Sequence, residues 1–125
     1  PTENRVAAVL DWELGTLGEP LADFTYLLTN WVNGTISQLP DMKAHGIPTH
    51  EEAVDYYCQL TGRPGLPDLN WYFAYNTFRL VGIIQGIIGR VRDGTANHPE
   101  AAKQGDRVLQ LAQTSWAFAK KAGAS

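Results

Sequence analysis

The sequence predicts a mostly α-helical fold with one short β-strand or hairpin, and three observations predict it. Apolar residues recur at intervals of three and four through four long stretches, which is the spacing of helices with one buried face. These stretches are bordered by residues that start or stop helices, such as Pro20 and Gly62. One continuous apolar run, residues 6–10, is partly β-branched and is too short for a helix.

The expected strand and its acidic end occupy residues 5–13. The apolar run leads into Asp11, and Glu13 follows two residues later, on the same face if the strand persists. A strand end is rigid and the loop after it is open to solvent, so Asp11 should be both fixed and reachable. Mg²⁺ takes one or two such carboxylates and fills its other positions with water and phosphate oxygens. Asp11 is therefore a candidate metal ligand and Glu13 a candidate for a second ion or its water shell; the alternative is that both are ordinary surface acids.

Four helices are expected, over residues 20–33, 49–62, 68–93 and 98–122. Pro20 suits the first position of the first helix, because the N–H that proline lacks has no partner there. Thr49 and Glu52 have the spacing of a capping box at the start of the second helix. Asp68 can cap the third helix, and Pro99 falls in the first turn of the fourth.

The third expected helix is long enough to cross the whole domain, and its apolar side chains recur at helical intervals. We expect the stripe that contains Trp71, Tyr75 and Phe78 to pack inward. Gly82, Gly86 and Gly89 lie within this helix, where each glycine costs roughly 0.5–1 kcal/mol relative to alanine. Close approach of another helix is the expected reason, and a ligand against the bare stripe is the alternative. Arg79 lies among apolar neighbours and would need a carboxylate partner if it is buried, so a structural ion pair is expected for it.

Composition excludes several classes of function. The net charge is −3 and the ten lysines and arginines are scattered, which argues against a surface for nucleic acid or anionic membrane. The single cysteine, Cys58, cannot form an internal disulfide, and a buried, unreactive thiol is expected. The most apolar run, residues 80–88, is too short to span a bilayer. The three histidines lack the spacing of metal ligands. We expect a cytoplasmic protein.

Residues 10–23, Leu-Asp-Trp-Glu-Leu-Gly-Thr-Leu-Gly-Glu-Pro-Leu-Ala-Asp, resemble the metal-binding segment of the aminoglycoside phosphotransferase and choline kinase-like family. Within that family they most resemble the kinase-like domains associated with acyl-CoA dehydrogenases, and the segments 70–73, 78–79 and 85–86 are similar too. Asp11 matches the magnesium-binding Asp of the protein-kinase D-F-G motif, and Glu13 departs from its Gly. The resemblance implies that Asp23 is a buried, second-sphere residue that holds the catalytic loop, although capping of the first helix would also explain it.

The same resemblance implies the helical C-terminal lobe of a protein-kinase-like α+β fold. It also implies an enzyme that uses Mg²⁺ and ATP to phosphorylate the hydroxyl of a small molecule. A hydroxyacyl-CoA is the leading acceptor; aminoglycoside, choline and homoserine-like acceptors are alternatives, and a phosphate of an acyl-CoA is an alternative partner for Arg79.

The family's His-Gly-Asp catalytic loop and second metal-binding Asn precede the matching segment, and neither occurs in this sequence. We therefore expect residues 1–125 to be a C-terminal fragment that contains no catalytic base and is inactive alone. The rival class is a helical interaction module without catalysis. The strand over residues 5–10 lacks a partner, so we expect it to pair with another chain, as in a homo-oligomer, or with another segment.

Overall fold

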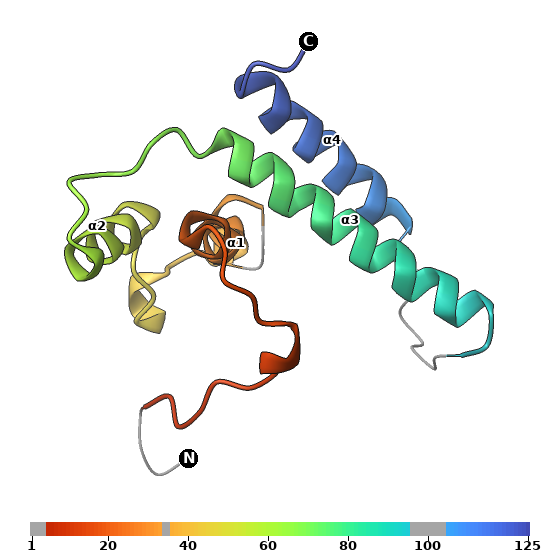
Figure 1. Cartoon of the computed structure of the whole chain (residues 1–125), viewed down its shortest axis with the longest axis horizontal. Coiled ribbons are helices and arrows are strands. Elements are labelled where there is room, and N and C mark those ends of the chain that lie inside the picture. The colour runs from red at the N-terminus through yellow and green to blue at the C-terminus, as the bar shows by residue number, and fades with distance from the viewer. Residues whose placement is uncertain (1–4, 34–35, 96–104) are drawn as a thin grey trace.

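The computed structural model describes residues 5–33, 36–95 and 105–125. These ranges contain three short 3₁₀ helices and four α-helices: α1 (Pro20–Val32), α2 (His50–Thr61), α3 (Asn70–Arg92) and α4 (Gly105–Lys121). In Figure 1, α1 and α4 lie against opposite sides of the long α3, and α2 lies beside α1. Residues 98–104, where the fourth helix was expected to begin, lie outside the described ranges.

The helix ends follow the local sequence. Pro20 occupies the first turn of α1, and the side chain of Glu19 accepts a hydrogen bond from the backbone N–H of Leu21 at 3.2 Å. The capping box of α2 is confirmed: Thr49 N–H donates to Glu52 at 2.8 Å, and Glu52 N–H donates to the Thr49 hydroxyl at 3.1 Å. These caps satisfy backbone donors that a helix leaves unpaired at its N-terminus.

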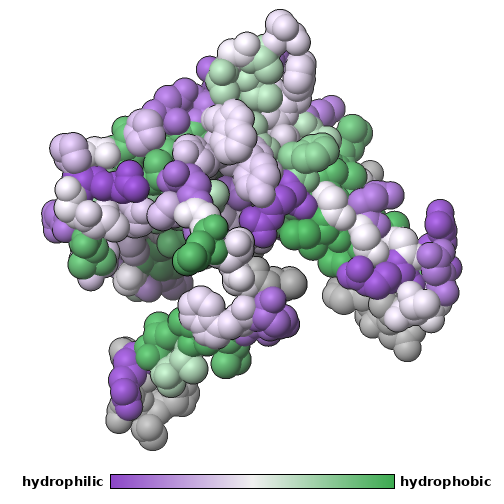
Figure 2. Space-filling view, viewed as in Figure 1, coloured by the Kyte–Doolittle hydropathy of each residue, from purple (hydrophilic) through white to green (hydrophobic). Residues whose placement is uncertain are grey.

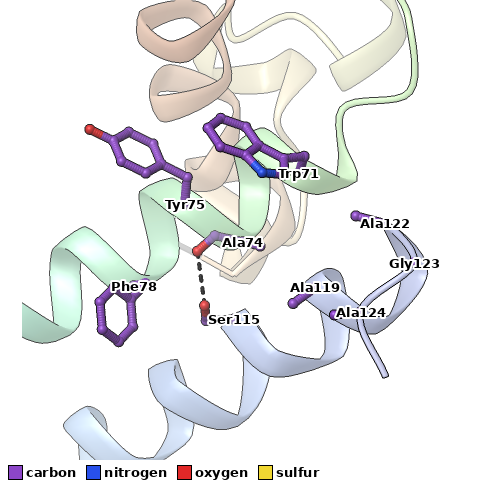
Figure 3. Close-up of a pocket in the computed structure, with 9 residues that line it drawn as sticks. All are labelled: Trp71, Ala74, Tyr75, Phe78, Ser115, Ala119, Ala122, Gly123 and Ala124. Atoms are coloured by element: carbon purple, nitrogen blue, oxygen red, sulfur yellow. Dashed lines mark hydrogen bonds between the residues drawn. The ribbon is translucent and has the colours of Figure 1, made fainter.

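The core lies where α1 and α4 meet α3. Its buried apolar side chains come from all three helices: Leu21, Leu28, Phe73, Ile84 and Leu111. Two hydrogen bonds cross these interfaces. The fully buried Asn76 of α3 donates from its side-chain amide to the Ala22 carbonyl of α1 at 2.8 Å. The Ser115 hydroxyl of α4 donates to the Ala74 carbonyl of α3, also at 2.8 Å (Figure 3). Because these acceptors are backbone atoms, the bonds fix the position of one helix on the next.

The strand expected over residues 5–13 is not present in the part of the chain that the structure describes. Residues 6–11 have no regular secondary structure, and Trp12–Leu14 form the 3₁₀ helix η1. A strand requires a neighbour for its backbone donors and acceptors, and no described segment pairs with this one. Figure 2 shows this segment projecting from the helices at the lower left, with hydrophobic residues on its surface. Val6 and Leu10 are 82% and 78% exposed.

The prediction for the buried face of α3 is also wrong. Trp71 and Phe78, which were expected to pack inward, are 59% and 67% exposed, and Tyr75 is exposed as well. The buried side chains of α3 are instead Phe73, Asn76, Thr77 and Ile84. This helix has apolar residues on most of its circumference, so the positions of α1 and α4 decide which face is covered.

None of the helices in the described ranges has both the length and the apolar content that a membrane span requires.

The glycines of α3 do not meet another helix in the described structure. A Cβ atom built on Gly82 or Gly89 would find no neighbouring atom within 4 Å. One built on Gly86 would meet only the guanidinium of Arg90, at 3.7 Å. The close helix approach expected from these glycines is therefore not found among the residues described.

Candidate active site

Asp11 stands at the junction between the N-terminal segment and η1. Its φ and ψ are 61° and 43°, and no other non-glycine residue in the described ranges has a positive φ. Backbone of this kind is strained for residues with a Cβ atom, although Asp tolerates it better than most, and such strain is concentrated at functional sites. The Asp11 side chain is exposed and forms no ion pair with another described residue. Its carboxylate is therefore open to a cation from solution.

The turn after Asp11 is closed by local hydrogen bonds. The indole N–H of Trp12 donates to the Val9 carbonyl at 2.8 Å, and Gly15 N–H donates to the Trp12 carbonyl at 2.9 Å. A Cβ atom built on Gly15 would lie 3.0 Å from that carbonyl oxygen, which is a tighter contact than Cβ atoms usually make. A larger residue at position 15 would therefore have to shift the turn by a few tenths of an ångström.

Glu13 lies in η1 rather than on a strand. The shared strand face that would have aligned its carboxylate with that of Asp11 therefore does not exist. Glu13 is exposed, and it lies two residues after Asp11. No group of three or more His, Cys, Asp or Glu side chains that could hold a metal occurs in the described ranges. Carboxylate donors fit Mg²⁺, because Mg²⁺ uses few protein carboxylates and takes water and phosphate oxygens for the rest.

A pocket of about 490 Å³ lies next to this turn. Its lining comes from three parts of the chain: the turn supplies Trp12, Gly15, Thr16 and Leu17, α1 supplies Asp23, and α3 supplies Arg79. This volume lies within the range of small-molecule sites. The segment that carries the candidate metal ligand therefore also forms one wall of a cavity large enough for a substrate.

Asp23 is exposed, which differs from the buried position that the family resemblance implied. It lies in the first turn of α1 but caps no backbone group in the described structure, because Glu19 performs that function. The carboxylate of Asp23 is therefore available at the wall of the pocket.

Arg79 lies opposite the turn residues, on α3. The ion pair expected for it is wrong within the described ranges, since no carboxylate lies within 4.0 Å of its side chain. Its guanidinium lies over the ring of Tyr26 instead, with 5.3 Å between Cζ and the ring centroid. Because the side chain is exposed, water solvates the charge, and the fold does not require a carboxylate to neutralise it.

Sequence reasoning missed Asn76. Its amide holds the Ala22 carbonyl, one residue before Asp23, so it fixes the first turn of α1 against α3. A usable signal was present: Asn76 and Arg79 are three residues apart and thus neighbours on one face of a mostly apolar helix. A buried polar side chain at such a place needs a specific partner.

A second hollow, of about 500 Å³, lies between α3 and α4 near the C-terminal end (Figure 3). Trp71, Tyr75 and Phe78 line one side of it, and its Ser115 hydroxyl is already bonded to the Ala74 carbonyl. None of its lining residues is a carboxylate, histidine, cysteine or amine. This hollow offers no group for phosphoryl transfer. The pocket lined by the turn after Asp11 is the candidate active site, because its described lining includes a carboxylate and a guanidinium, although Asp11 and Glu13 themselves are not among its lining residues.

Comparisons with known proteins show what the chain is similar to. Residues 2–57 match the model of the phosphotransferase enzyme family. The chain is 37% identical over 129 residues to acyl-CoA dehydrogenase family member 10 of Mus musculus, covering 98% of this chain and 12% of that protein. It is 35% identical over 126 residues to family member 11 of Homo sapiens, covering 97% of this chain and 16% of that protein.

A plant protein is also similar: the probable acyl-CoA dehydrogenase IBR3 of Arabidopsis thaliana, 32% identical over 129 residues, covering 94% of this chain and 16% of that protein. The chain thus spans about an eighth to a sixth of the length of these relatives. No solved structure matches it significantly. The resemblance noted in residues 10–23 is confirmed, because that segment lies within the residues that match the phosphotransferase enzyme family.

Proposed function

We propose that residues 1–125 form the metal-binding segment and helical C-terminal lobe of a cytoplasmic, ATP-dependent kinase for a small hydroxyl-bearing molecule. The observation that carries this proposal is Asp11: an exposed carboxylate, held in a strained backbone conformation, directly before the turn that lines a pocket of about 490 Å³. The family match supports it, because that match includes Asp11 and the turn that follows.

Each residue of the site has a distinct part in this proposal. Asp11, with Glu13 beside it, would hold Mg²⁺, which neutralises charge on the transferred phosphoryl group when bound. The hydrogen bonds of Trp12 and Gly15 hold the Asp11 backbone in place before the ion arrives, so little reorganisation is needed on binding. Asp23 accepts backbone N–H groups of the catalytic loop. The base that takes the hydroxyl proton lies outside residues 1–125, and the 125-residue chain alone is expected to be inactive.

We propose a hydroxyacyl-CoA as the acceptor. Relatives in mammals and a plant are named acyl-CoA dehydrogenases or members of that family. A kinase joined to such an enzyme would act on a related thioester that carries a hydroxyl group. Aminoglycosides, choline and homoserine-like compounds are the acceptors to compare it with.

The test is Asp11→Asn in the protein as its gene encodes it. Asn tolerates the left-handed conformation that Asp11 adopts, so this change removes the charge and keeps the turn. The matched control is Asp55→Asn, an exposed acid on α2. We expect Asp11→Asn to slow ATP-dependent phosphorylation of a hydroxyacyl-CoA by about a hundredfold or more, while Asp55→Asn stays near the wild-type rate. A wild-type rate in Asp11→Asn would favour the non-catalytic interaction module.

A further inference from the structure

Among the described residues that line the pocket next to the turn after Asp11, Arg79 is the one cation. We propose that it binds an anionic group of the phosphoryl acceptor, a phosphate or a carboxylate, and so selects acceptors that carry negative charge away from the reacting hydroxyl. This inference rests on the proposed function and adds to it a residue that determines specificity.

The first reason is that the hydrogen-bonding edge of Arg79 is unused in the described structure. The contact with Tyr26 occupies one face of the guanidinium, with 5.3 Å to the ring centroid. The N–H donors lie in the plane of the guanidinium, and a contact through its face leaves that plane open. No described residue accepts a hydrogen bond from Arg79 or forms an ion pair with it. These donors match the fork geometry of phosphate and carboxylate oxygens.

The second reason is the distribution of charge in the pocket. Asp23 and Arg79 both line the pocket but form no ion pair. The guanidinium nitrogens of Arg79 therefore lie more than 4.0 Å from the carboxylate oxygens of Asp23. The remaining walls are the indole of Trp12, the Thr16 hydroxyl, Gly15 and Leu17. Because Asp23 does not neutralise Arg79, the guanidinium charge is available to an anionic group of a ligand in this pocket of about 490 Å³.

The third reason is rigidity. Arg79 lies one helical turn after Asn76, whose hydrogen bond to the Ala22 carbonyl fixes α3 against the first turn of α1. Asp23 follows Ala22 directly, so the two charged walls of the pocket are carried by helices that are locked together. Specificity requires such a fixed spacing, because a loosely held cation would accept anions in many positions.

The binding test needs no catalysis. Inorganic phosphate is titrated by calorimetry into the protein as its gene encodes it, and into Arg79→Gln, Arg79→Lys and Arg90→Gln. Arg90 is an exposed arginine of the same helix that does not line this pocket, so Arg90→Gln is the matched control. We expect Arg79→Gln to weaken phosphate binding about tenfold or more, and Arg79→Lys to keep part of it. Unchanged binding in Arg79→Gln, or an equal loss in Arg90→Gln, would overturn the inference.

The kinetic test identifies which substrate carries the anion, since ATP and the acceptor both offer phosphates. With 3-hydroxybutyryl-CoA as the acceptor, Arg79→Gln should raise the acceptor KM about tenfold and leave the KM for ATP nearly unchanged. A rise confined to the KM for ATP would assign Arg79 to the nucleotide and overturn the inference. Failure here leaves the proposed function intact, because that function is judged on Asp11→Asn. Conversely, phosphate binding at Arg79 can be observed even if no kinase activity is found.

Discussion

The N-terminal segment, residues 5–19, and the core formed by α1, α3 and α4 differ in how much of their apolar surface is buried and in what their hydrogen bonds join. In the core, Leu28 is fully buried and Asn76 makes a hydrogen bond across two helices. In the segment, Leu17 is completely exposed, and the hydrogen bonds of Trp12 and Gly15 stay within residues 9–15. The candidate metal ligand lies on the weakly supported segment, and Asp23 and Arg79 lie on the strongly supported helices.

This difference implies that stability and chemistry can be separated by mutation. Buried apolar area is the main source of folding free energy, and the segment buries little of it. Changes in the core should therefore alter the free energy of unfolding, and changes in the segment should alter activity and leave that free energy almost unchanged. The following predictions test this division, from the largest expected change in stability to the smallest.

Leu28→Ala should lower the free energy of unfolding by about 2–5 kcal/mol, because it leaves a cavity at a site that the helices enclose. Leu17→Ala removes the same atoms from a fully exposed position and should change it by less than about 0.5 kcal/mol. Urea denaturation followed by circular dichroism measures both. Equal effects at the two positions would mean that the segment is packed against something that the described structure does not contain.

Asn76→Ala should lower the free energy of unfolding by about 1–3 kcal/mol, because the buried Ala22 carbonyl loses its side-chain donor. Gln85→Ala, at an exposed position of the same helix, is the control and should stay within about 0.5 kcal/mol of wild type. The same denaturation experiment compares them. If Asn76→Ala matched the control, this hydrogen bond would not be what fixes α1 against α3.

Gly82→Ala should raise the free energy of unfolding by about 0.5–1 kcal/mol, since the added methyl group meets open space and alanine favours the helix. Thermal unfolding of the 125-residue chain is the measurement. A loss of stability would instead show that another helix approaches this face, as the glycine spacing first suggested.

The smallest expected effect is the pH dependence of stability that arises from Glu51. The pKa of Glu51 lies below its usual value because its own backbone N–H and the Thr49 hydroxyl hydrogen-bond to its carboxylate. These hydrogen bonds stabilise the folded state while the Glu51 carboxylate is charged. Their contribution to the free energy of unfolding is present above the ordinary pKa of a glutamate and is lost as the pH falls through the lowered pKa. A carboxyl-carbon NMR titration should show the lowered pKa in wild type and a return towards the ordinary value in Thr49→Ala. An unshifted Glu51 in wild type would contradict this.

The sequence predicted the parts of the fold that local chemistry decides. Pro20, Thr49 and Gly62 mark helix ends because their own backbones or side chains determine capping. It did not predict which face of α3 is buried, because that depends on where α1 and α4 dock. Nor did it predict the state of residues 5–13, because strand formation depends on a partner elsewhere.

The candidate site divides in the same way. Asp11 and the glycine-bearing turn were recognisable from the order of residues, because they are neighbours in the chain. Arg79 lies more than fifty positions after Asp23 in the sequence, yet both residues line the same pocket. Asn76 donates to the Ala22 carbonyl across a similar separation in the sequence. The spacing of Asn76 and Arg79 on a mostly apolar helix signals that they need partners, but which partners they meet follows from helix packing, which no local pattern indicates.

The most direct test is whether Asp11 binds the metal. Electron paramagnetic resonance can measure Mn²⁺ binding, as a substitute for Mg²⁺, in the ATP-saturated protein as its gene encodes it. We predict that Asp11→Asn weakens Mn²⁺ binding about tenfold or more, while Asp55→Asn leaves it unchanged. Equal Mn²⁺ affinity in Asp11→Asn and wild type would contradict a metal site at this turn.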